Sequence, residues 1–267
     1  MNLKANSYKL RQDILDIVYH AKGGHIGGDM SVIDTLNVLY NKQMNVTPEN
    51  FHDPDHDRFI LSKGHTVEAL YAVLCQKGFF PREDLKTVSQ YLSKYIGHPN
   101  NKVNGIEMNS GSLGHGLSVA IGMALAGKMD KRDYRVYVVM GDGELAEGSV
   151  WEGAMAGGHY KLDNLTIIID NNGLQIDGTN DEVMSLGDLP AKLRAFGFDL
   201  YEIDGHDLDA IEAALSAPVT AGKPKAILAH TVKGKGISFM ENQVGWHGKA
   251  PNDEQYQQAM RELEEGI

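Results

Sequence analysis

Short runs of apolar and β-branched residues recur along the chain, and longer amphipathic stretches separate them. The short runs cover residues 58–61, 136–140, 165–169, 199–203 and 226–229. Turn-forming residues flank these runs, which is typical of buried strands. Apolar residues at helical spacing occupy residues 8–21, 31–40, 67–76, 117–128, 150–159 and 208–216. A charged stretch at 253–264 has the pattern of a helix lying on the surface.

The alternation of strands and helices predicts an α/β fold. We expect a mostly parallel, doubly wound sheet with helices on both faces. No repeat, low-complexity tract or Pro- or Ser-rich linker divides residues 1–267, so we expect a single domain. In open parallel sheets, ligands bind beyond the carboxyl ends of the strands. Functional residues are therefore expected just after the apolar runs.

The composition argues against two classes of partner. The chain is 42% hydrophobic and 23% charged, and no stretch approaches the roughly 18 apolar residues that a membrane span requires. A formal net charge of −11 argues against nucleic acid. The first residues lack the pattern of a secretory signal, so we expect a cytoplasmic protein. The one cysteine, Cys75, is expected to be a buried thiol.

A glycine-rich acidic turn follows the strand at 136–140. Residues 141–144 read Gly-Asp-Gly-Glu, and a helical pattern begins near Ser149. The glycines let the backbone approach a ligand, and the N-terminus of the following helix suits a diphosphate. Asp142 adds a carboxylate, and Mg²⁺ commonly bridges carboxylates to phosphates. The turn therefore predicts a site for magnesium and a diphosphate.

A second polar turn follows the strand at 165–169. Residues 170–174 read Asp-Asn-Asn-Gly-Leu, and Asn172 lies about thirty residues after Asp142. Adjacent parallel strands would bring both turns to one sheet edge, where Asn172 offers a side-chain oxygen and Leu174 a main-chain carbonyl. Either motif alone would also fit an ordinary turn. The pair, each following a β-branched strand, favours a ligand site.

The paired turns resemble the signature of the thiamine-diphosphate enzymes, Gly-Asp-Gly followed some thirty residues later by Asn-Asn. The resemblance implies that Asp142, Asn172 and the carbonyl of Leu174 hold Mg²⁺, for which Ca²⁺ or Mn²⁺ could substitute. It also implies that Gly141 lies at the cofactor and that the N–H of Gly143 contacts its diphosphate.

Four histidines lie in glycine-rich turns, namely His25, His65, His98 and His247. Glycine neighbours leave an imidazole approachable, so that it can donate to hydroxyl or phosphate oxygens. A hydrogen bond to a charged group contributes about 1.5–3 kcal/mol. Each histidine alone would also fit a surface or core position, and no spacing among them indicates a zinc site.

These turns, together with residues 57–65 and 111–116, resemble the N-terminal, diphosphate-binding domain of transketolase over essentially the whole chain. In that resemblance His65 and His247 contact the diphosphate. His25 and His98 line the channel to the sugar hydroxyls.

The same resemblance gives roles to three other residues. It sets Gly111 and Leu113 against the aminopyrimidine end of the cofactor, and Glu147 near a subunit boundary; an ordinary helix-start acid is the alternative for Glu147. The chain departs from the family pattern at Ile26, Asn100 and His115, and the segment before Trp246 lacks a histidine that many members have. These departures leave the cofactor assignment intact but weaken any inference about the sugar.

The resemblance further implies a transferase that moves a two-carbon ketol unit from a ketose phosphate to an aldose. In the family, a glutamate that contacts the pyrimidine lies on a second domain. We therefore expect a separate C-terminal subunit that carries it, in a heterotetramer with two sites. The alternatives are a 2-oxo acid dehydrogenase E1 α chain, a deoxyxylulose-phosphate-synthase-like enzyme, or a non-catalytic cofactor-binding subunit.

Overall fold

Five parallel strands form the centre of the computed structural model, which describes residues 1–267. They are β1 (Arg58–Leu61), β2 (Val136–Gly141), β3 (Leu165–Asn171), β4 (Asp199–Asp204) and β5 (Lys225–His230). Their order is β1-β2-β3-β5-β4, and every neighbouring pair runs parallel. The predicted parallel α/β class is confirmed, and the last four strands are a residue or two longer than predicted.

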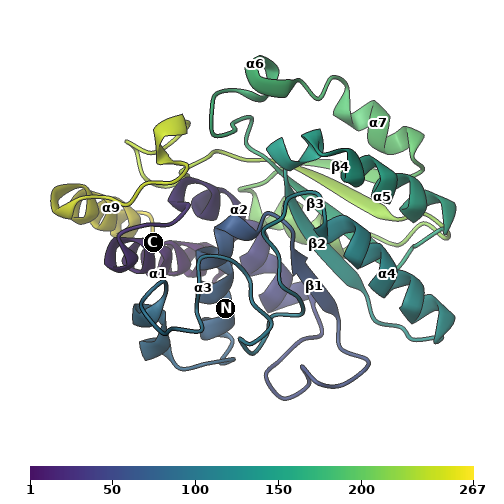
Figure 1. Cartoon of the computed structure of the whole chain (residues 1–267), viewed down its shortest axis with the longest axis horizontal. Helices are drawn as coiled ribbons and strands as arrows, with labels where there is room; N and C mark the ends of the chain where they lie inside the picture. Colours follow the sequence, from purple (N-terminus) through teal and green to yellow (C-terminus); the bar gives the residue numbers. More distant parts are fainter.

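Helices cover both faces of this sheet (Figure 1). One layer contains α1 (Leu3–Ala21), α2 (Ile26–Val38), α3 (Val67–Gln76) and α8 (Leu208–Ser216). The opposite layer contains α4 (Gly116–Met129), α5 (Gly148–His159) and α7 (Leu189–Ala195). The short helices are η1 (Leu39–Gln43), η2 (Gly64–Thr66), η3 (Arg82–Thr87), η4 (Gly143–Ala146), η5 (Val244–Trp246) and α6 (Asn180–Met184).

The core has two parts, one on each face of the sheet. One cluster contains 44 buried residues and the other 22. Alternate residues of a strand enter opposite clusters: in β2, Tyr137 and Val139 enter the larger, and Val138 and Met140 the smaller. Since both faces are covered, β2 carries apolar side chains on both faces from Val136 to Met140, which explains its continuous hydrophobic run.

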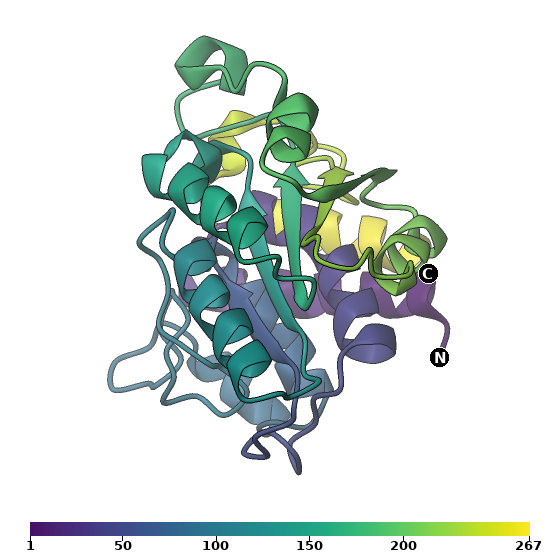
Figure 2. The ribbon, with the colours of Figure 1, turned by 90° about the vertical axis from the view of Figure 1, so that its right-hand side faces the viewer.

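The C-terminal helix α9 (Asp253–Glu265) packs along α1, which places the yellow and purple ends of the chain side by side (Figure 2). The rings of Tyr19 and Tyr256 stack with centroids 4.2 Å apart. The hydroxyl of Tyr256 donates to Asp16 at 2.5 Å. No helix of the chain combines the length and apolar character that a bilayer crossing needs.

Two helices begin five residues earlier than predicted, the second of them for a packing reason. The helix expected at 8–21 begins at Leu3. The helix expected at 31–40 begins instead at Ile26. Glycines near its start suggested a turn, but they lie inside the helix. They are glycines because close packing leaves no room for a side chain there. A Cβ on Gly27 would lie 2.9 Å from the carbonyl oxygen of Trp246, and one on Gly28 would lie 2.8 Å from Thr66. His25 consequently stands directly before the first turn of α2.

Candidate functional site

The turns after β2 and β3 meet at the carboxyl edge of the sheet. Gly141 pairs with Asp170 in the strand register. Beyond that pair, Oδ2 of Asp142 accepts from the N–H of Gly173 at 2.5 Å, and Oδ1 accepts from the N–H of Gly143 at 2.8 Å. The two sequence motifs are therefore joined through one carboxylate, whose pKa is raised by burial and by the charge of Asp170.

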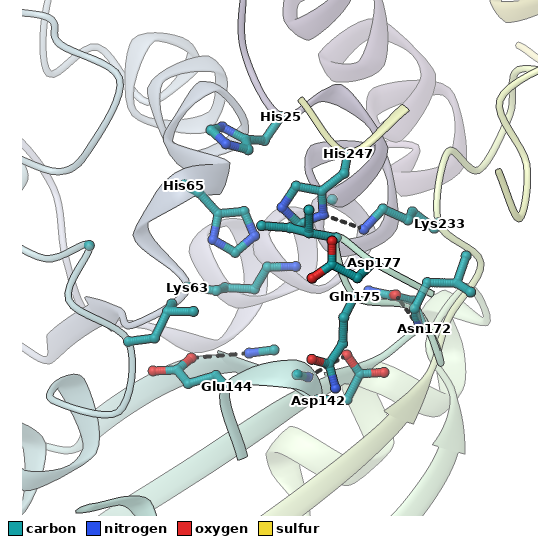
Figure 3. A pocket seen from close by; sticks show the side chains of 17 residues that line it. His25, Lys63, His65, Asp142, Glu144, Asn172, Gln175, Asp177, Lys233 and His247 are labelled. Atoms are coloured by element: carbon teal, nitrogen blue, oxygen red, sulfur yellow. Dashed lines mark hydrogen bonds between the residues drawn. The ribbon is translucent and has the colours of Figure 1, made fainter. Parts of the chain in front are cut away.

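A cavity of about 330 Å³ opens at these turns (Figure 3). Ten of the residues singled out in the sequence line it: His25, His65, Gly111, Leu113, Gly141, Asp142, Gly143, Asn172, Leu174 and His247. They come from segments spread over most of the chain. The fold therefore brings together most of the residues that were selected by motif.

His98 and Glu147 are not among the residues that line this cavity. Both are exposed. The ring of His98 lies behind Gly111, with its centroid 6.3 Å from that of His25. Glu147 precedes the first turn of α5 and lies beside Gly114. Their expected roles in the sugar channel and at a subunit boundary stay predictions.

Three histidines form a cluster on one wall of the cavity. The ring centroids of His25 and His65 are 5.1 Å apart, those of His25 and His247 5.5 Å, and those of His65 and His247 5.3 Å. Burial and neighbouring positive groups lower all three pKa values, that of His247 to about 3. The imidazoles are therefore neutral at pH 7. Nδ1 of His25 is buried and has no partner within the chain.

Two buried lysines that no motif marked as functional, Lys63 and Lys233, also line the cavity. Lys63 forms an ion pair with Asp170, which also accepts from Ser31 Oγ at 2.6 Å. Lys233 donates to Nδ1 of His247 at 2.8 Å, and burial, with the charge of Lys63, lowers its pKa to about 8. Lys233 follows the end of β5, so the rule that pointed to Asp142 could have found it.

Glu144 is a buried carboxylate that connects three loops. It accepts from the hydroxyl of Ser62 after β1, from the N–H of Gly114 at 2.8 Å and from the N–H of Gly141 at 3.2 Å. In the sequence, Glu144 stands out only as the last residue of the Gly-Asp-Gly-Glu turn. Its acceptor role was not visible there, because the donors come from distant segments.

A small hairpin borders the cavity after Asn172. Leu174 and Thr179 form an antiparallel bridge, and Gln175, Ile176 and Asp177 between them line the cavity. Ile176 is 65% exposed. Nε2 of Gln175 is buried without a hydrogen-bond partner, so a polar group can still be received here.

The donor atoms near Asp142 are of mixed kinds. No group of three or more His, Cys, Asp or Glu side chains is placed to hold a metal ion. A cation at these turns would therefore take one carboxylate together with amide and carbonyl oxygens. Such an oxygen set suits a hard cation such as Mg²⁺.

Comparison with known families decides which class of protein has this arrangement. Residues 4–264 match the family described as "Transketolase, thiamine diphosphate binding domain". The chain belongs to the transketolase family. The fold and the family expected from the sequence are thereby confirmed.

Several curated transketolase relatives match almost the whole chain. An apulose-4-phosphate transketolase subunit from Phocaeicola vulgatus is 51% identical over 99% of this chain and 95% of the relative. The "6-deoxy-6-sulfo-D-fructose transketolase subunit SqwG" of Clostridium sp. is 41% identical over 99% of this chain and 97% of the relative. The prediction of a transketolase N-terminal subunit is confirmed by these relatives.

Solved transketolases share the fold. The enzyme from Campylobacter jejuni superposes with a TM-score of 0.93 at 31% identity, covering 99% of this chain and 43% of that chain. A transketolase from Leishmania mexicana gives a TM-score of 0.88 at 28% identity, covering 45% of that chain. This chain therefore spans less than half the length of these transketolases.

Proposed function

We propose that the chain is one subunit of a two-chain transketolase that uses thiamine diphosphate and Mg²⁺. In this proposal residues 1–267 form one cofactor-binding domain of a cytoplasmic enzyme. The observation that carries it is the convergence of the Asp142 turn, the Asn172 turn and the histidine cluster on one cavity.

The cavity fits the diphosphate end of the cofactor. Lys233 is buried, and its ammonium is bonded to a neutral imidazole rather than to a carboxylate. A buried ammonium without a counter-ion is costly unless an anion joins it. We assign His65, His247 and Lys233 to the diphosphate, and Gly111 and Leu113 to the pyrimidine end.

The metal would be held at the two turns. We assign it the carboxylate of Asp142, the side-chain oxygen of Asn172 and the carbonyl of Leu174. Burial and Asp170 raise the pKa of Asp142, and a cation beside this carboxylate would reverse that destabilisation. Ca²⁺ or Mn²⁺ could occupy the same oxygen set.

The bound cofactor supplies a carbanion that accepts the two-carbon ketol unit. The residues of this chain bind, orient and exclude water. His25 is neutral, so it can donate one hydrogen bond to a sugar hydroxyl and accept another, beside His65 at the diphosphate. His98 would extend this row toward solvent. Removing a donor that acts mainly in the transition state lowers the rate by about 10²–10³.

A partner chain completes the proposed enzyme. Two of the relatives that are themselves named as transketolase subunits are about as long as this chain. The pyrimidine-contacting glutamate expected for the family would belong to a second polypeptide. We propose a heterotetramer with two sites, with Glu147 near the boundary between subunits. The names of relatives suggest the donors to test first, apulose 4-phosphate and 6-deoxy-6-sulfofructose, beside xylulose 5-phosphate.

The test is reconstitution. The chain is co-expressed with its C-terminal partner, sought in the neighbouring reading frame, and ketol transfer is measured with each donor. We expect transfer by the complex and none by either chain alone, and Asp142→Ala should abolish Mg²⁺-dependent cofactor uptake in calorimetry. A complex that binds cofactor but transfers nothing would instead indicate a non-catalytic role for this chain, and decarboxylation of pyruvate would indicate another thiamine-dependent class.

A further inference from the structure

Two buried carboxyl groups face each other behind the histidine cluster. Asp29 lies in the first turn of α2 and Glu68 in the first turn of α3, and the residues are 0% and 1% exposed. Oδ1 of Asp29 accepts from the N–H of Ala69 at 2.9 Å, whereas Oδ2 of Asp29 and Oε2 of Glu68 have no other partner. Because Ala69 directly follows Glu68 in α3, its bond to Asp29 holds the Asp29 carboxyl group beside that of Glu68. One shared proton would satisfy both oxygens.

The surroundings favour a single proton on the pair. Two adjacent buried carboxylates cannot both ionise readily. Burial raises the pKa of both groups, and the charge of Glu68 raises that of Asp29 further. Lys63 is the positive group that bears on Asp29, but its ammonium is paired with Asp170. Burial raises the pKa of the Tyr71 phenol, and the charge of Glu68 raises it further.

The groups packed around the pair add no further counter-ion. From α1, the side chain that reaches the adjoining loop is Val18, which is apolar. His25 and His65, which precede the two helices, are neutral because burial lowers their pKa values. One remaining negative charge is tolerated, because it lies at the N-termini of two helices.

The pair is connected to the positions of both histidines. Asp29 follows His25 by about one helical turn, and Glu68 follows His65 by about the same distance. Gly24 has φ of +146°, and a Cβ at this glycine would lie 2.9 Å from Oε1 of Glu68. Glu68, on α3, therefore abuts the loop that carries His25 toward the cavity.

We propose that Asp29 and Glu68 share one proton and act as positioning residues, clasping the starts of α2 and α3 and so fixing His25 against His65. This inference rests on the proposed function for its effect on ketol transfer. When the shared proton is lost, two negative charges stand side by side and push the two helix starts apart. His25 then leaves its place 5.1 Å from His65.

Three variants separate this role from a general structural one. In Glu68→Gln the amide donates to Asp29 at every pH, so the hydrogen bond between the two side chains no longer depends on a shared proton. In Glu68→Ala the hydrogen bond between the two side chains is lost, and Asp29 is left as a buried acid without its partner. Glu83→Gln, on the exposed side of η3, is the matched control.

The first measurement is thermal unfolding of the full chain between about pH 5 and pH 8. Both acids have pKa values raised in the folded state, so their contribution is complete below about pH 4 and is lost as pH rises through the raised values. The melting temperature of Glu68→Gln relative to wild type should therefore increase with pH, and that of Glu83→Gln should not. Parallel curves for Glu68→Gln and wild type would overturn the shared proton.

The second measurement is the pH profile of kcat/KM in the assembled enzyme. We expect Glu68→Gln to retain activity near neutral pH and to move the alkaline limb upward, while Glu68→Ala loses about tenfold, the effect of about 1.4 kcal/mol. Equal profiles for Glu68→Gln and wild type overturn the positioning role. If the wild-type complex transfers no ketol unit, the proposed function is rejected, and the unfolding curves alone then decide the acid pair.

Discussion

Lys233 donates a hydrogen bond to Nδ1 of His247 at 2.8 Å, and both side chains line the same cavity. In the free chain the protonated form of each side chain is disfavoured. Burial and nearby positive charge lower the pKa of Lys233 to about 8 and that of His247 to about 3. Lys63 adds a second buried ammonium on the same side. A polyanion bound between these groups would compensate their buried positive charge. Affinity for a diphosphate is therefore obtained at the expense of the stability of the free chain.

Replacing Lys233 by methionine should separate these two effects. Loss of one charge-assisted hydrogen bond, about 1.5–3 kcal/mol, should weaken thiamine diphosphate binding by about 10- to 100-fold in calorimetry of the assembled enzyme. The free chain should melt at a higher temperature, because a buried ammonium is removed. Lys235→Met is the control, since Lys235 is 37% exposed and its ammonium lies 3.5 Å from Glu241. Unchanged cofactor affinity in Lys233→Met would contradict the assignment.

Cofactor binding should take up protons above neutral pH. The pKa of Lys233 is about 8 in the free chain, and an adjacent diphosphate raises it, so the protonated form is the one that binds. Affinity should therefore fall as pH rises above about 8. Titrations at this pH in two buffers of different ionisation enthalpy should give different heats for wild type and Lys235→Met. Heats that do not depend on the buffer would show that Lys233 stays remote from the charge.

The fold was largely predictable because its strongest determinants are local. The continuous apolar runs of β2 and β3 and the turns after them are visible in sequence, and a parallel sheet aligns such turns at one edge. The start of α2 was missed because Gly27 and Gly28 are required by close packing with distant residues. Helix α7 was missed although Asp188 caps it, accepting from the N–H of Ala191 at 2.9 Å. It is too short for apolar periodicity to reveal.

The site was predictable where a motif marks it. Asp142, Asn172 and the glycine-flanked histidines could be chosen from the sequence. Lys63 and Glu144 were overlooked because their importance lies in burial and in partners far along the chain, Asp170 and Gly114 among them. Burial of a charged side chain is a property of the folded packing, so sequence spacing alone does not reveal it.

Glu144 should stabilise the site through the hydrogen bonds that it accepts rather than through its negative charge. Glu144→Ala leaves the buried N–H groups of Gly114 and Gly141 without an acceptor, which costs about 1–3 kcal/mol for each group. We expect the free energy of unfolding in urea to fall by about 2–6 kcal/mol. Glu144→Gln keeps an acceptor oxygen and should lose clearly less. Equal losses in the two variants would mean that the negative charge, and not the hydrogen bonding, matters here.

Gly111 offers a test of how the cavity depends on His98. Its φ is +137°, and a Cβ at this position would lie 2.6 Å from Cδ2 of His98. Gly111→Ala must therefore either shift the His98 ring or move the backbone that lines the cavity. Because backbone strain of this kind costs about 1–3 kcal/mol, we expect cofactor affinity to fall by about 5- to 100-fold.

The matched control for this variant is Gly122→Ala, in the exposed part of α4, where an added Cβ meets nothing within 4 Å. Alanine in a helix interior is favoured over glycine by about 1 kcal/mol, so this control should melt slightly higher and bind cofactor as wild type does. Gly111→Ala combined with His98→Ala distinguishes the two causes. Recovery of affinity in the double variant assigns the loss to collision with the His98 ring, since removing that ring leaves the backbone strain at Gly111 in place. Persistence of the loss assigns it to the backbone that lines the cavity.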